Sequence, residues 1–360
     1  MKIPLISIGI VVVLLLVIIL LGAGTGEAPP DYQEVKKQHE DSLVAMEGVT
    51  GVCTYPDTHE IVVMIEDEHM AATIPQTIDG YPVTVVVTGK LTAHVAAAPL
   101  APAATPFPDS DSPPFATTTE PARRLDPAGL NAYAASITPT GIARPLIGGI
   151  SVGNAGFPGS AGTLGLVVTG AEGDDDLYGL GCAHVLALGN DGMVVPLGTP
   201  VLQPAGSRAP AERSRIGNLT HFTAIAFSRS GVNYADAAIT RLEVDGLPGL
   251  VLDAANGTFY TLNGTTTVTR GDTVRKSGIT TGVTTGQVIA TDAIVRVFFT
   301  DDQWAIFRDQ VLTGTIGSAG DSGSAVDRDG RFVGLYFAGS DTAGVICKAE
   351  HILGPLGVTI

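Results

Sequence analysis

Residues 320–326 read GDSGSAV, and residues 331–337 continue with the apolar pattern RFVGLYF. The intervening DRDG suits a tight hairpin turn, because Asp-Gly is favoured where two strands reverse. Similar short runs of β-branched and aromatic residues, separated by Gly, Asn and Asp, recur across residues 147–360. Such runs predict strands, and segments that could form crossover helices are almost absent between them. The sequence therefore predicts a mainly β domain, an antiparallel barrel or sandwich, over residues 147–360.

Composition narrows the classes of partner and cofactor. The chain has 36 acidic against 20 basic residues, a formal charge of −16, and no dense Lys/Arg run. We expect no nucleic-acid partner, because phosphate binding requires a basic face. The acidity fits solubility outside a cell or an acidic recognition surface. The three cysteines form no CxxC pair, so we expect no structural zinc and no cofactor; whether Cys182 and Cys347 form a disulfide stays open.

The N-terminus predicts export. Residues 3–21 are 19 residues without a charge, long enough to cross a bilayer. Lys2 precedes them and acidic residues follow, so the positive-inside rule places the rest of the chain outside. We expect residues 1–24 to be a transmembrane anchor, or alternatively a signal peptide cleaved near residues 22–24. The chain is then attached to the cell membrane with its domains extracytoplasmic, or it is secreted.

Two further segments precede the β domain. Residues 31–95 combine a helical pattern that ends at Gly48 with three strand patterns, VTGVCTY, EIVVMIE and YPVTVVV. They predict a small α/β module without a catalytic cluster. Residues 96–146 contain ten prolines and are rich in Ala and Thr. This composition predicts an extended linker.

Ser322 within GDSGS is either the corner of a hairpin or a nucleophile. A serine hydroxyl attacks only when a base removes its proton, so a catalytic role requires a histidine and a group that orients it. His184 in GLGCAHVLA is the candidate base, whereas His221 lies in a polar strand pattern that predicts exposure. Asp236 in NYADAAITRLE is the candidate orienting group, because a carboxylate among alanines would be buried and require a partner. A turn aspartate bonded to its own backbone is the alternative for Asp236.

The order His184, Asp236, Ser322, together with GDSGS, resembles the trypsin-like serine peptidases of the chymotrypsin fold, in a bacterial or archaeal type with an added N-terminal module. The resemblance covers residues 147–360 and implies a double antiparallel β-barrel. It also implies an oxyanion hole formed by the backbone N–H groups of Gly320 and Ser322. The family pattern places the floor of the specificity pocket at Ile316 and its wall at Phe337, Ala338 and Gly339. A floor without an acid implies preference for a small or apolar side chain.

These observations predict an exported serine endopeptidase that acts on polypeptides. Two alternatives remain. The domain could be a catalytically silent binding or scaffold protein on the same fold, or a peptidase that processes only itself, with the linker as its substrate. The acidic run at residues 172–176 lacks the spacing of an EF-hand and fits a solvated hairpin loop; we expect no metal site.

Overall fold

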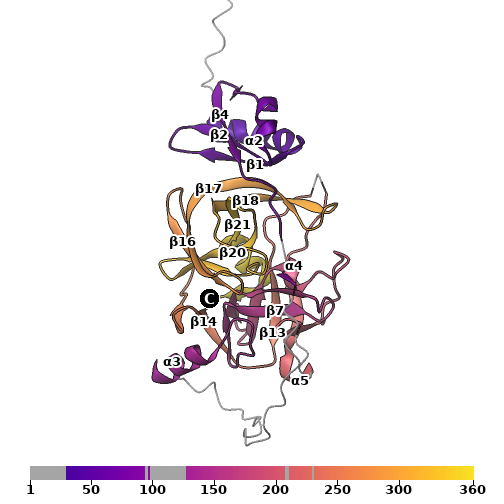
Figure 1. The fold of residues 1–360 in the computed structure, drawn as a ribbon, viewed down its shortest axis with the longest axis vertical. Coiled ribbons are helices and arrows are strands. Elements are labelled where there is room, and N and C mark those ends of the chain that lie inside the picture. Colours follow the sequence, from indigo (N-terminus) through magenta and orange to yellow (C-terminus); the bar gives the residue numbers. More distant parts are fainter. Residues whose placement is uncertain (1–29, 94–95, 98–126, 207–210, 229–230) are drawn as a thin grey trace, which may run out of the picture.

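The computed structural model describes residues 30–93, 96–97, 127–206, 211–228 and 231–360. The expected membrane or signal segment, residues 1–24, lies outside these residues. Among the described helices, none has both the length and the apolar character needed to cross a bilayer. Three layers follow one another along the long axis in Figure 1: the N-terminal module, the barrel formed by the C-terminal strands, and a second barrel below it.

The N-terminal module has the helix and the three strands that the sequence predicts. Its helix ends four residues before Gly48, which has a left-handed φ of 73°. β1 and β2 are antiparallel, while β2 and β4 run parallel with Ile61 opposite Val83. The elements are α2 (Tyr32–Val44), β1 (Val49–Tyr55), β2 (Glu60–Ile65), η1 (Glu68–Thr73), β3 (Thr77–Ile78) and β4 (Tyr81–Val87).

The C-terminal strands form a closed barrel. Their order is β16-β19-β20-β21-β18-β17, and β16 pairs again with β17. The long β17–β18 hairpin forms the side that faces the module, and β1 pairs with β17 at Gly51–Val295. The strands are β16 (Thr273–Gly278), β17 (Gly282–Phe298), β18 (Trp304–Gly314), β19 (Ala325–Arg328), β20 (Arg331–Gly339) and β21 (Ala343–Lys348).

The other sheet has the order β22-β9-β10-β13-β12-β11-β7-β8-β5. Only Gly165 separates β8 from β9, so one continuous segment supplies a strand near each end of this sheet. The strands are β7 (Ile150–Asn154), β8 (Ser160–Leu164), β9 (Leu166–Gly170), β10 (Leu177–Gly181), β11 (Pro200–Leu202), β12 (Arg215–Phe222) and β13 (Ala238–Leu242), joined by β5 (Ala96–Ala97) and β22 (Val358–Thr359).

The remaining elements are short. A small sheet of β6 (Leu146–Gly148), β14 (Gly246–Asp253) and β15 (Thr258–Thr261) lies beside the barrels, and α4 (Ala183–Leu186) follows β10 directly. The other helices are α3 (Pro127–Ser136), α5 (Ala211–Ser214), η2 (Ala349–His351) and α6 (Leu353–Leu356). The prediction of a mainly β chain is confirmed.

The expected linker over residues 96–146 is wrong for its second half. α3 forms from Pro127, a residue that is favourable in the first turn of a helix. Ile137, Ala143 and Leu146 are then buried in the main core. Proline content alone suggested an extended spacer, but the apolar residues between the prolines pack against the barrel.

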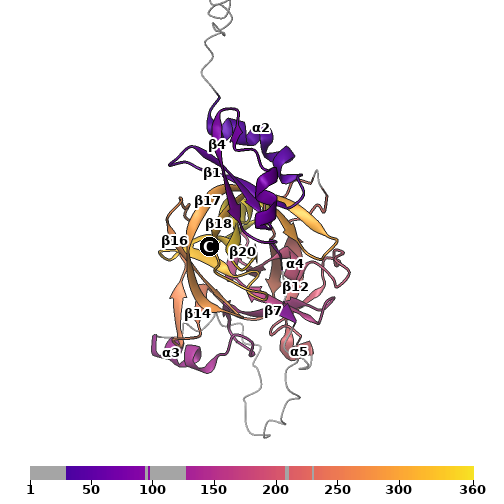
Figure 2. The same ribbon diagram turned by 45° about the horizontal axis from the view of Figure 1, so that its top comes forward.

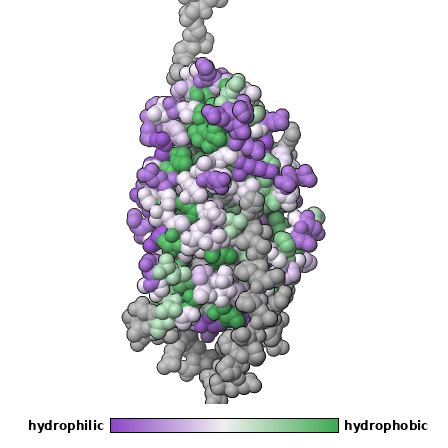
Figure 3. Space-filling model, in the orientation of Figure 1, coloured by the Kyte–Doolittle hydropathy of each residue, from purple (hydrophilic) through white to green (hydrophobic). Residues whose placement is uncertain are grey.

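On the face drawn in Figure 3, hydrophobic and hydrophilic residues are interspersed. The turned view in Figure 2 shows α2 lying on the outer side of the module's sheet. The principal core lies within and between the barrels, and a second cluster joins the module to β17 and β18 through residues such as Ile61, Ile294 and Ile306.

Candidate active site

His184 and Asp236 meet because β10 and β13 pair side by side. Gly181 at the end of β10 lies opposite Ala238 at the start of β13. His184 lies shortly after Gly181, in α4, and Asp236 lies shortly before Ala238. Asp236 Oδ2 lies 2.5 Å from His184 Nδ1, and Asp236 Oδ1 accepts the backbone N–H of His184 at 3.0 Å. Both side chains are buried, with 3% and 0% of their surface exposed.

This contact assigns the tautomer of the ring. A carboxylate only accepts hydrogen bonds, so Nδ1 carries the proton and donates it to Asp236. Nε2 is then the basic nitrogen of the neutral imidazole. Two bonds to one carboxylate fix both the ring and the backbone of His184, which is the arrangement a general base requires.

Ser322 lies in a turn between β18 and β19 that is bonded to the other barrel. Gly320 and Gly323 both have a φ of +97°, a backbone conformation that favours glycine. Thr163 in β8 donates its backbone N–H to the carbonyl of Ser322 at 2.8 Å and its hydroxyl to the carbonyl of Gly320 at 2.9 Å. A Cβ at Gly323 would lie 2.1 Å from the Thr163 carbonyl oxygen. The turn is thereby held against the barrel that carries His184.

The nucleophile candidate and the base candidate are not joined by a hydrogen bond. Ser322 Oγ donates to the carbonyl oxygen of Phe337 at 3.1 Å. Within the described part of the chain, His184 Nε2 is buried and has no hydrogen-bond partner. Catalytic hydrogen bonds are often incomplete in the absence of substrate. The structure thus brings His184 and Asp236 together and places Ser322 in an anchored turn.

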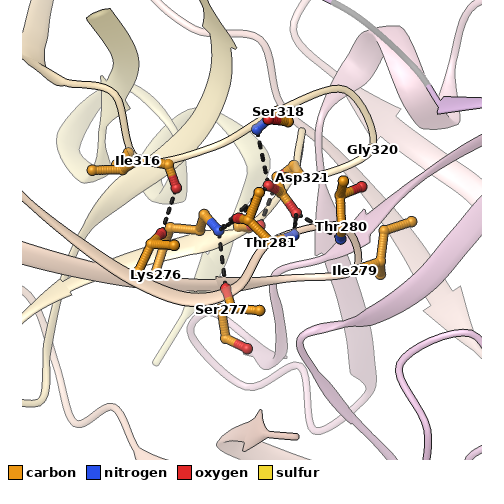
Figure 4. Close-up of polar contacts among 12 residues, drawn as sticks. Lys276, Ser277, Ile279, Thr280, Thr281, Ile316, Ser318, Gly320 and Asp321 are labelled. Carbon is orange, nitrogen blue, oxygen red and sulfur yellow. Dashed lines mark hydrogen bonds and ion pairs between the residues drawn. The ribbon is translucent and has the colours of Figure 1, made fainter. Parts of the chain in front are cut away.

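The carboxylate of Asp321 holds the turn from beneath. It accepts the backbone N–H groups of Ser318 at 2.9 Å, Thr280 at 2.8 Å and Thr281 at 3.2 Å, and the hydroxyl of Thr281 at 2.6 Å (Figure 4). Lys276 Nζ lies 3.4 Å from Asp321 Oδ2, and both side chains are fully buried. These contacts fix the peptide planes on either side of Asp321, and the second of these planes includes the backbone N–H of Ser322.

Sequence reasoning did not identify Lys276 or Gly278 as site residues. A Cβ at Gly278 would lie 2.3 Å from Asp321 Oδ1 and 2.6 Å from Ser324 Oγ, so only glycine fits there without a shift. Lysine is seldom fully buried unless it is paired, and nothing in RKSGITTG signals that the partner is 45 residues away. The hairpin β16–β17 carries both residues to the turn.

Of the residues predicted to form the specificity pocket, one lines a cavity beside Ser322 and the others are buried away from it. A cavity of about 510 Å³ is lined by residues including Ser322, Gly317, Tyr336 and Gly339. Gly339 is the one predicted pocket residue among them; Ile316, Phe337 and Ala338 are buried but do not line the cavity.

Tyr336 is a further residue that the sequence did not single out. A Cβ at Gly317 would lie 2.6 Å from its ring, and a Cβ at Gly339 would lie 2.6 Å from its hydroxyl. The ring therefore fills the space between these two glycines and limits the size of a side chain that could enter. Burial raises the pKa of the Tyr336 hydroxyl above its ordinary value, as does nearby Asp321, so this group stays a neutral hydrogen-bonding group.

Solved structures of serine proteases resemble this chain. A glutamic acid specific serine protease is 22% identical over 60% of this chain and 100% of its own, with a TM-score of 0.44. Thermobifida fusca protease A is 18% identical over 59% and 96%, with a TM-score of 0.43. A Cellulomonas bogoriensis chymotrypsin is 19% identical over 59% and 97%, with a TM-score of 0.43. No family model matches the chain, and a search of curated proteins found no match.

One group of potential metal ligands overlaps the site. Ligand atoms of Cys182, His184 and Asp236 all lie within 4.8 Å of one another. Cysteine binds a metal well only as a thiolate. Burial raises the pKa of the Cys182 thiol well above its ordinary value, so this thiol stays protonated. Its Sγ instead donates weakly to the carbonyl of Tyr336 at 3.6 Å. The arrangement favours a proton-transfer pair, His184 and Asp236, over a metal centre. All three cysteines of the chain are free and buried.

Proposed function

We propose that the chain is a serine endopeptidase that hydrolyses peptide bonds through an acyl-enzyme on Ser322. The observation that carries this proposal is the buried pair of His184 Nδ1 and Asp236 Oδ2 at 2.5 Å, in the same barrel to which the Ser322 turn is bonded through Thr163. A buried imidazole with a fixed tautomer, in the barrel that binds the turn of Ser322, fits nucleophilic catalysis better than a structural role.

In this mechanism, Ser322 Oγ leaves the Phe337 carbonyl and attacks the carbonyl carbon of the substrate while His184 Nε2 takes its proton. Asp236 stabilises the imidazolium that results. The backbone N–H groups of Gly320 and Ser322 donate to the oxyanion, and their orientation depends on Asp321. His184 then protonates the leaving amine, and a water molecule hydrolyses the ester by the same route in reverse.

The substrate and the location follow from other parts of the chain. Tyr336 and Gly339 line the cavity beside Ser322, and the Tyr336 ring limits its size. Neither Ile316 nor residues 337–339 carry an acid, so we expect a small or apolar side chain at the cleaved residue. The formal charge of −16 is unfavourable for nucleic acid. The apolar residues 3–21 support export, with residues 1–24 as a membrane anchor or a cleaved signal.

A catalytically silent scaffold is the second candidate. It is favoured by the hydrogen bond from Ser322 Oγ to Phe337 and by the unpartnered Nε2 of His184 in the described part of the chain. A binding protein on this fold would need neither residue to move.

A fluorophosphonate probe distinguishes the two candidates. We expect the purified full chain to be labelled, and labelling to be lost in Ser322→Ala and in His184→Ala. Ser42→Ala and His221→Ala, at exposed positions, serve as matched controls and should be labelled like the wild type. Absence of labelling in a folded wild-type chain would establish the scaffold instead.

A further inference from the structure

The segment that leaves the module runs between the barrels beside Ser322. In Figure 1 it descends from the module past β18 toward α4. We call residues 88–93 of this segment the strap. Thr92 donates its backbone N–H to the Gly339 carbonyl at 2.9 Å and accepts the Gly339 N–H at 3.0 Å. The strap therefore pairs antiparallel with the last residue of β20.

The opposite edge of the strap is bonded to β17. Ala93 donates its N–H to the Phe298 carbonyl at 2.8 Å, and Phe298 donates its N–H to the Leu91 carbonyl at 2.9 Å. The side chains of Leu91 and Ala93 are buried in the main core. Backbone bonds on both edges and apolar burial thus hold residues 91–93 as a short strand between β17 and β20.

The loop that follows Gly339 holds the start of the strap. The Thr88 carbonyl accepts the hydroxyl groups of Ser340 and Thr342, the latter at 2.9 Å. The loop residues nearest to Gly339 in sequence therefore bond to the strap as Gly339 itself does.

The edge of β20 that the strap covers is the edge that leads to Ser322. β20 lies between β19 and β21, and β21 takes one of its edges as far as the pair Gly339–Gly344. The strap therefore lies on the other edge, the one occupied further along by β19 and the turn that precedes it. On that side, Ser322 Oγ donates to the carbonyl of Phe337, two residues before Gly339.

The strap is also a wall of the cavity beside Ser322. Four of its residues line this space of about 510 Å³ together with Ser322 and its turn: Thr88, Gly89, Lys90 and Thr92. A molecule that enters the cavity toward Ser322 therefore meets the strap on its way.

We propose that the strap is an internal pseudosubstrate, which occupies the edge of β20 along which a peptide must pair to reach Ser322. Extended peptides commonly bind by adding a strand to a free sheet edge, through main-chain hydrogen bonds. Gly339 offers one N–H and one carbonyl there, and Thr92 uses both. This inference rests on the proposed function and adds its regulation: a peptide substrate displaces the strap, whereas a small molecule that needs no bond to Gly339 does not.

Two probes of different reach test the strap in the full chain. An alkyl fluorophosphonate reacts with a serine nucleophile without pairing at Gly339, whereas a phosphonate that carries a trialanine peptide extends along β20. The measured quantity is the ratio of the two labelling rates, trialanine probe over fluorophosphonate. A folded wild type that the fluorophosphonate does not label would count against the proposed function, and the ratio alone decides on the strap.

A pair of variants at Thr92 changes this ratio. Thr92→Pro removes the N–H that bonds to Gly339, and Thr92→Ala is the matched control, because both variants lose the Thr92 hydroxyl and only alanine keeps the N–H. We expect the ratio to be about tenfold higher in the proline variant, the factor that one lost hydrogen bond of ordinary strength gives. Equal fluorophosphonate rates in the two variants show that the site is intact in both. Equal ratios, or no labelling of either variant by the trialanine probe, would then overturn the inference.

Hydrogen exchange tests the strap without a substitution. The amides of Thr92, Ala93 and Gly339 are bonded and should exchange slowly in the free wild type. We expect exchange in a peptic fragment that covers the strap to rise when the trialanine probe is attached to Ser322, and to stay unchanged when the fluorophosphonate is attached. A strap that remains protected in the trialanine adduct would show that peptides reach Ser322 by another route.

Discussion

Lys276 and Asp321 form an ion pair from which solvent is excluded. Nζ lies 3.4 Å from Oδ2, and neither side chain has exposed surface. Lys276 also donates to the Gly282 carbonyl at 2.9 Å and to the hydroxyl of Thr281. Burial lowers the pKa of Lys276 from its ordinary value, and Asp321 opposes that shift. The pair links the β16–β17 hairpin to the turn that carries Ser322, so the geometry of the site depends on it.

Replacing Lys276 by Met should therefore damage both stability and the site. Removing one partner of a buried pair leaves an uncompensated charge, which costs about 3 to 5 kcal/mol; the bonds that Asp321 keeps from Ser318, Thr280 and Thr281 favour the lower end. Urea unfolding measures the loss, and Lys37→Met on the exposed face of α2 is the matched control. Unchanged stability would mean that Asp321 is held by its hydrogen bonds alone.

Asp236→Asn should impair the reaction while preserving the fold. An amide beside Nδ1 favours the wrong tautomer of His184, and the comparable change in a well-studied triad lowers turnover by about four orders of magnitude. The rate of probe labelling measures the effect, with exposed Asp245→Asn as control. Full labelling of Asp236→Asn would show that His184 is not oriented through this carboxylate.

Gly278→Ala tests the packing beneath the oxyanion turn. The new methyl group would lie 2.3 Å from Asp321 Oδ1, so the turn must shift. We expect labelling to fall at least tenfold, since sub-ångström misplacement of oxyanion donors costs catalysis steeply. Gly314→Ala is the control, because nothing lies within 4 Å of a Cβ there. If the Gly278→Ala and Gly314→Ala chains are labelled equally fast, the rigidity of this turn does not contribute to the reaction rate.

The buried thiol of Cys347 should make the free energy of unfolding decrease at alkaline pH. Burial raises the pKa of its thiol from 9.0 to about 12, so the unfolded chain loses this proton first as pH rises. The group's contribution is constant below pH 9, and stability then falls between pH 9 and 12, by up to about 1.4 kcal/mol per pH unit. Denaturant titrations of wild type and Cys347→Ala across this range isolate the effect. Parallel curves for the two proteins would contradict it.

Tyr336 should set the size of the accepted side chain. Tyr336→Ala vacates the space between Gly317 and Gly339, and we expect cleavage of a peptide library to shift toward larger apolar residues. Tyr336→Phe, which keeps the ring, should retain the preference for small residues. A library profile that is the same in all three proteins would place specificity elsewhere.

The sequence predicted the elements and the residues that depend on local pattern. β1, β2 and β4 lie where the apolar runs predicted strands. His184 and Asp236, which the sequence offered as candidate partners, are in contact. Contacts between strands that lie far apart in the sequence could not be predicted from local patterns. The pairing of Thr92 with Gly339 spans 247 positions, and no composition or period in either segment encodes it. The second half of the expected linker is ordered because Ile137 and Leu146 are buried in the main core, although prolines flank them.

The pairing of β1 with β17 also bears on solubility. Ile294 on β17 and Ile306 on β18 are buried only because the module lies over them. Without the module, the edge of β17 would present free backbone donors and acceptors beside an apolar surface, a template for pairing with another molecule. The module would therefore protect the barrel against aggregation for as long as β1 stays paired with β17.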